Sequence, residues 1–133
     1  MLLMDETGRR LKPTNSEVAI LRVLWTIGPG TVREVHDELT KTREIGYTTV
    51  LKLMQIMLEK GLLVREEQGR GHVYHPAEAQ DSAKRNLVGD LMDRAFGGSA
   101  HDLVMHALTA KRSTPEELAE IRKLLDQLED RHE

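Results

Sequence analysis

The sequence predicts a mainly α-helical protein that contains one small β-hairpin. Apolar residues recur at helical spacing along most of the chain. Only four of the 133 residues are aromatic, so the core must be largely aliphatic. Residues 62–76 instead hold two short extended runs on either side of Gln68-Gly69-Arg70-Gly71, a pattern typical of a hairpin turn. The length suits one ordinary domain, or a small domain with appended helices.

Two helices are expected before residue 40. Thr14-Asn15-Ser16-Glu17 fits a capping box, so the first helix should start near Ser16. It should end at Gly28-Pro29-Gly30, which combines permissive backbone with a helix breaker. Thr31 is the expected N-cap of a second helix. The narrow apolar stripe of that helix consists of Val32, Val35 and Leu39.

A third helix is expected from about residue 48 to residue 60, closed by Gly61 at the favoured C-terminal position. At 100° per residue it has two faces. The apolar face consists of Val50, Leu53, Met54, Met57 and Leu58, and the polar face of Thr48, Lys52, Gln55 and Glu59. Ile56 departs from this pattern, because it falls on the polar side.

Three further helices are expected after Pro76, which ends the hairpin. One is marked by Leu87, Val88, Leu91, Ala95 and Phe96 and is stopped by Gly97-Gly98; a shorter one, capped by Ser99, carries Leu103, Val104, Ala107 and Leu108. The last is signalled by Thr114-Pro115-Glu116-Glu117, an N-cap followed by a helix-starting proline and a capping-box glutamate.

Three small helices followed by a hairpin match the winged variety of helix-turn-helix, in which the third helix enters the DNA major groove. The third helix exposes hydroxyls, an ammonium and an amide that suit base edges. Arg43 and Tyr47 are expected to bind phosphate, and Arg70 to bind phosphate or a narrow minor groove. An ordinary solvated helix shows a similar face, but its combination with a glycine-flanked arginine favours DNA. Contact with a thymine methyl and packing on the second helix both suit Ile56, and packing is favoured.

The charge distribution permits this function without requiring it. The net charge is −3, yet residues 9–76 hold 11 Lys and Arg against 8 Asp and Glu. The absence of cysteine excludes disulfides, thiolate metal sites and cysteine catalysis. Residues 1–4 are apolar but are followed at once by Asp5 and Glu6, unlike a secretory signal, and no run reaches membrane-spanning length. We therefore expect a cytoplasmic protein without a membrane segment.

The six histidines do not form a recognisable ligand set. His72 and His75 are three residues apart on a strand, and His101 and His106 are five apart on a helix, so neither pair converges on one metal ion. No glycine-rich phosphate loop, nucleophile elbow or HExxH motif is present. We expect no metal, no cofactor and no enzymatic activity.

The C-terminal helices are expected to form a homodimer. The last helix carries an apolar stripe too broad for an isolated helix in water, so it needs a partner surface. A two-fold dimer also matches a palindromic site and gains affinity by binding two half-sites at once. The residues expected at the dimer interface are Leu87, Leu91, Leu103, Leu118, Ile121, Leu125 and Leu128.

The segments TVREVHDEL, YTTVLKLMQIMLEKGLL and GRGHVYHP, with Thr14, Glu17 and Leu24-Trp25 before them, resemble the penicillinase repressor (BlaI/MecI) family of bacterial transcriptional regulators. The resemblance covers roughly residues 11–130. It implies a winged helix-turn-helix DNA-binding domain over residues 11–76 and a helical dimerisation region over residues 77–133. It also assigns Tyr47, Thr48, Thr49, Lys52 and Gln55 to the recognition segment and Arg70 to the wing.

The chain departs from the family at two places that concern induction. Repressors of β-lactam resistance share an Asn-Phe bond that is cut on induction, but the corresponding residues 103–107 read LVMHA and no Asn-Phe pair exists in the sequence. The copper-responsive branch uses a cysteine cluster, which is absent here. We expect a repressor that binds double-stranded palindromic operator DNA, with a regulatory protease as a candidate partner. A winged-helix protein–protein interaction module is the alternative.

Overall fold

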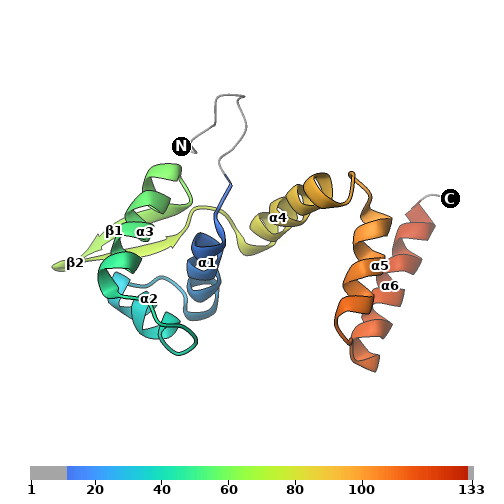
Figure 1. Cartoon of the computed structure of the whole chain (residues 1–133), viewed down its shortest axis with the longest axis horizontal. Coiled ribbons are helices and arrows are strands. Elements are labelled where there is room, and N and C mark those ends of the chain that lie inside the picture. Colours follow the sequence, from blue (N-terminus) through green and yellow to red (C-terminus); the bar gives the residue numbers. More distant parts are fainter. Residues whose placement is uncertain (1–11, 132–133) are drawn as a thin grey trace. The chain divides into compact units, whose positions relative to one another are not determined.

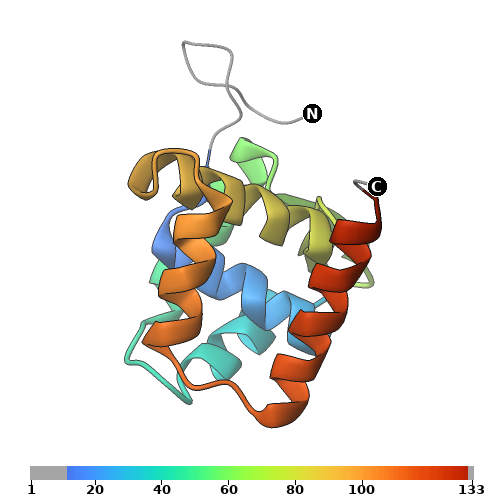
Figure 2. The same cartoon turned by 90° about the vertical axis from the view of Figure 1, so that its right-hand side faces the viewer.

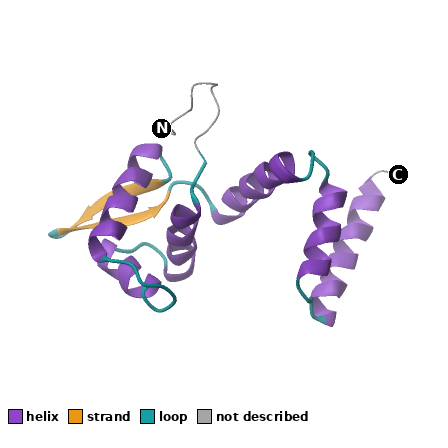
Figure 3. Ribbon diagram, in the orientation of Figure 1, coloured by secondary structure: helices purple, strands orange, loops and turns teal. Residues whose placement is uncertain are grey.

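The computed structural model describes residues 12–131, which contain six α-helices and one two-stranded antiparallel sheet (Figures 1 and 3). In chain order the elements are α1 (Asn15–Ile27), α2 (Val32–Leu39), α3 (Tyr47–Lys60), β1 (Leu63–Gln68), β2 (Gly71–Pro76), α4 (Gln80–Ala95), α5 (Ala100–Ala110) and α6 (Pro115–Arg131). Residues 1–11, to which the expectations about a secretory signal refer, and residues 132–133 lie outside the described range. The predicted mainly α-helical fold with a hairpin is confirmed.

Two compact units divide the chain, one ending at Lys84 and the other beginning at Arg85. The division falls inside α4, eight residues beyond the predicted boundary after Pro76. That boundary stays a prediction.

Reciprocal hydrogen bonds cap the first two helices. The Thr14 hydroxyl accepts from the Glu17 amide at 3.2 Å, and the Glu17 carboxylate accepts from the Thr14 amide at 2.8 Å. Thr31 and Glu34 repeat this arrangement at the start of α2, with distances of 3.1 and 3.0 Å. Both predicted N-caps are therefore confirmed, and each box satisfies two amides that lack partners within the helix.

The core of the first unit lies between the three helices and the hairpin. Its buried members are Ile20, Leu21 and Leu24 of α1; Val32, Val35 and Leu39 of α2; Val50, Met54 and Met57 of α3; and Leu62, Leu63 and Tyr74 at the hairpin. As predicted, α3 ends at Gly61, whose φ of 79° is a left-handed conformation that favours glycine. This conformation turns the chain directly into the hairpin.

One buried ion pair joins the start of α1 to the end of α3. The Glu17 carboxylate, whose side chain is 2% exposed, accepts from the Lys60 ammonium at 2.7 and 3.1 Å. Lys60 also lies in the last turn of α3, where the helix dipole favours a positive charge. A single carboxylate thus caps one helix and fixes the other against it.

The hairpin is tight and is attached to the helices by backbone hydrogen bonds. Its strands pair from Leu63 with Pro76 to Gln68 with Gly71, so Gly69 and Arg70 alone form the turn. Gly69 has a φ of 60°, which a two-residue hairpin turn needs. Between α1 and α2, Gly30 exchanges two backbone hydrogen bonds with Tyr74, of 3.0 and 2.8 Å. This bridge sets the position of the wing.

The helices of the second unit pack only loosely against one another. None of the helices α4, α5 and α6 packs extensively against another, and Figure 2 shows α5 and α6 apart. Neither α5 nor α6 contains a buried residue. The predicted cap of α5 is confirmed, because the Ser99 hydroxyl accepts from the Asp102 amide at 3.0 Å. None of the described helices is both long and apolar enough to cross a membrane.

Candidate nucleic-acid interface

Helix α3 has the two faces that its sequence predicts. Val50, Met54 and Met57 are fully buried. The opposite face carries Thr48, Thr49, Lys52 and Gln55, all of which are exposed. Neither Lys52 nor Arg70 forms an ion pair with a described residue, so both cations are available to an anionic partner.

Arg70 lies at the tip of the wing and is exposed. Its position in the two-residue turn directs it away from the core. The strands behind it carry Glu66 and Glu67, and the Glu66 carboxylate lies 3.3 Å from Nε2 of His75. Besides Arg70 at the tip, the wing carries Arg65, an exposed cation on β1 next to these two carboxylates.

Tyr47 is the first residue of α3, one position earlier than the predicted start, and its side chain is 39% exposed. Two residues of α2 hold its ring. The Arg33 guanidinium lies over the ring, 5.1 Å from its centroid, and the His36 ring meets it edge-on at 5.8 Å. Sequence reasoning identified Tyr47 but missed Arg33 and His36, because nothing in the α2 sequence indicates which exposed residue faces α3.

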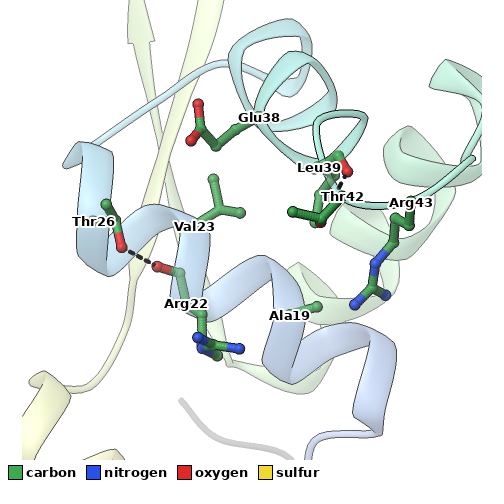
Figure 4. Close-up of a pocket in the computed structure, with 8 residues that line it drawn as sticks. All are labelled: Ala19, Arg22, Val23, Thr26, Glu38, Leu39, Thr42 and Arg43. Atoms are coloured by element: carbon green, nitrogen blue, oxygen red, sulfur yellow. Dashed lines mark hydrogen bonds between the residues drawn. The ribbon is translucent and has the colours of Figure 1, made fainter.

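Arg43 has different neighbours from Tyr47. It lines an open hollow of about 210 Å³ between α1 and the C-terminal end of α2, and Arg22 lines the same hollow (Figure 4). The other residues that line it are Ala19, Val23, Thr26, Glu38, Leu39 and Thr42. The structure thus brings Tyr47 together with Arg33 and His36, while Arg43 faces α1.

The favoured interpretation of Ile56, packing against the second helix, is wrong. Its side chain is 36% exposed and does not belong to the hydrophobic residues packed on the core. Ile56 is four positions after Lys52, only about 40° away around the helix, so it shares the exposed side of α3.

Within residues 12–131, no group of three or more histidine or carboxylate side chains converges to hold a metal ion. Two of the imidazoles lie close to backbone carbonyls instead: His36 Nε2 is 3.0 Å from the carbonyl of Ile45, and His106 Nδ1 is 2.9 Å from the carbonyl of Asp102. The described part of the chain therefore offers no argument for a metal centre.

The second unit exposes much apolar surface. Eight of the twelve large hydrophobic residues that stand out as exposed lie between Val88 and Leu128. Of the residues expected at a dimer interface, Leu91, Leu125 and Leu128 are exposed, and Leu87, Leu103, Leu118 and Ile121 are partly buried. Such a concentration of exposed apolar side chains marks an interaction surface.

Helices α1–α3, followed by a hairpin that is tied back at Gly30, define a winged helix-turn-helix protein. The family described as penicillinase repressor matches residues 13–127, and the chain belongs to this family. The resemblance seen in the sequence is thereby confirmed.

Two related proteins align with most of this chain, and one solved structure aligns with about half of it. The transcriptional regulator BlaI of Mycobacterium tuberculosis is 31% identical over 118 residues, which cover 87% of this chain and 84% of that protein. The penicillinase repressor of Bacillus licheniformis is 23% identical, over 89% of this chain and 92% of its own. The solved structure of monomeric B. licheniformis BlaI with the blaP half-operator is 25% identical, with a TM-score of 0.49, over 55% of this chain and 89% of that one.

Proposed function

We propose that this protein is a DNA-binding transcriptional repressor that binds a palindromic operator as a homodimer. The observation that carries the proposal is the open polar face of α3, in a chain that belongs to a repressor family. In winged helices of this kind the third helix enters the major groove and the wing lies on the backbone or in the minor groove. Repression is proposed to take place in the cytoplasm, where bacterial DNA is accessible.

The exposed residues divide by the part of the DNA that their chemistry suits. Thr48, Thr49 and Gln55 offer neutral donors and acceptors, which suit base edges and so determine sequence preference. Four other residues, Arg43, Tyr47, Lys52 and Arg70, suit phosphates, which supply most of the affinity without sequence information. Of these, Arg43 has the weakest geometric support, because it faces the hollow beside α1.

Dimerisation is proposed to occur through the second unit. Its helices bury few side chains among themselves and expose a row of leucines along α6, including Leu124, Leu125 and Leu128. A second copy of the same surface would cover this row and would pair two winged helices for the two halves of a palindrome.

We propose that a regulatory protease releases the protein from DNA by cutting a bond other than Asn-Phe. Residues 103–107 lie in the middle of α5, where Val104 and Met105 are exposed. A protease requires an extended backbone, so a cut there would need α5 to unwind locally. Because α5 contributes no buried residue, such unwinding sacrifices little packing within the protomer.

Fluorescence anisotropy with labelled duplex DNA, titrated at several KCl concentrations, tests the proposed function. We expect affinity to fall steeply and linearly on a log–log plot as salt rises, because bound cations displace counterions. We also expect an inverted repeat to bind more tightly than the same bases scrambled. Binding that is independent of salt would refute phosphate recognition, and the protein-interaction module would then be favoured.

A further inference from the structure

We infer that Arg33 and Tyr47 form one phosphate-binding unit, in which Arg33 of α2 contacts the DNA backbone beside the recognition helix. This inference rests on the proposed function and adds to it a residue that neither the sequence pattern nor the exposed face of α3 identifies. It begins from the cation–π contact, with the guanidinium 5.1 Å from the Tyr47 centroid.

The contact with the ring leaves the Arg33 donors without a described partner. The guanidinium lies over the ring, 5.1 Å from its centroid, and its N–H groups bond to no described residue, so they remain available. These donors match two phosphate oxygens at once. Arg33 is exposed and forms no ion pair with any described residue. The adjacent carboxylate, Glu34, is already bonded to the Thr31 amide at 3.0 Å.

The Tyr47 ring is contacted from a second side by His36, which restrains its position. His36 meets the ring edge at an interplanar angle of 78°. Its Nε2 donates to the Ile45 carbonyl at 3.0 Å, two residues before Tyr47, so His36 links α2 to the turn that leads into α3. Its other nitrogen, Nδ1, lies 3.6 Å from the Asp37 carboxylate, too far for a hydrogen bond.

Rigidity matters because a mobile arginine loses conformational entropy when it binds. An arginine held over an aromatic ring has already lost part of that freedom in the unbound protein, so less is lost on contact with phosphate. The tyrosine hydroxyl adds a neutral donor on the same exposed surface. Removal of either partner should therefore weaken the contribution of the other.

The test uses the full chain and a labelled mixed-sequence duplex of about three helical turns, because a phosphate contact does not depend on sequence. Anisotropy is measured across KCl concentrations for the wild type, Arg33→Gln, Tyr47→Leu and the double variant. Arg112→Gln is the matched control: it removes the same charge from an exposed arginine between α5 and α6, outside the proposed DNA-binding unit. Circular dichroism melting checks that every variant is folded.

We expect Arg33→Gln to weaken binding about tenfold and to reduce the salt slope by about one, as for one lost charge-assisted contact. Arg112→Gln should change affinity less than about twofold, as for a charge outside the contact. The double variant should lose about as much as the worse single variant, because the two residues act as a unit. The unit would be refuted if the affinity losses of the two single variants multiplied in the double variant, or if Arg33→Gln left the salt slope unchanged. The proposed function would stand in either case. A wild-type protein that binds no DNA would overturn both.

Discussion

The buried pair between Glu17 and Lys60 provides a sharp test of how the DNA-binding unit is held together. In Glu17→Ala the Lys60 ammonium, with a side chain only 20% exposed, loses two contacts of 2.7 and 3.1 Å. Breaking a buried pair in this way costs about 3–5 kcal/mol. Lys60 retains some access to water, so about 3 kcal/mol is appropriate. The Thr14 amide loses its partner as well, for about 1 kcal/mol more.

The expected loss of about 4 kcal/mol is a large part of the 5–15 kcal/mol typical of a domain. Urea denaturation followed by the fluorescence of Trp25, the only tryptophan, measures it. Glu34→Ala is the matched control, because Glu34 holds the same capping-box position in α2 without a lysine partner. The control should lose about 1 kcal/mol at most. Equal losses in the two variants would show that the Lys60 contact contributes nothing and would refute the reasoning.

Three further outcomes are expected. Lys52→Ala and Arg70→Ala should each weaken DNA binding and reduce its salt slope by about one without lowering the melting temperature, and a variant that unfolds would place that residue in the scaffold. Leu125→Glu should shift the protein from dimer to monomer in sedimentation equilibrium while the first unit stays folded; an unchanged mass would remove Leu125 from the interface. Gly61→Ala should destabilise the protein by about 1–2 kcal/mol in urea, because its φ of 79° strains a side chain. A neutral result there would mean that α3 ends differently.

The features that the sequence predicts well are local ones. Each helix start that was assigned to Thr14, Thr31 or Thr114 depends on hydrogen bonds between residues three apart, so the pattern and the structure lie in the same few residues. The hairpin turn is local in the same sense, since Gly69 and Arg70 join paired strands directly. The exposed face of α3 also follows from helical spacing alone.

The features that the sequence does not predict connect distant segments. Glu17 and Lys60 are 43 residues apart, and the Gly30–Tyr74 bridge spans a similar distance. No pattern in a single sequence identifies such partners. The contact of Arg33 with Tyr47 belongs to this class, which explains why the sequence pattern does not bring Arg33 to the start of α3.

Two local expectations also needed revision. Helix α4 begins at Gln80, well before the apolar positions that mark it in the sequence. Its first turns are polar and carry no apolar stripe, so the apolar pattern does not indicate where the helix starts. Packing on the second helix was favoured for Ile56, but its side chain is 36% exposed, on the polar side where helical spacing alone places it.

The central claim is that the exposed side of α3 and the wing tip together recognise a specific DNA sequence. Selection of bound fragments from the genomic DNA of the source organism, followed by sequencing, tests it most directly. We expect enrichment of an inverted repeat whose half-site centres lie one or two helical turns apart, and loss of that enrichment for Gln55→Ala. Recovery of fragments with no shared motif would contradict the claim.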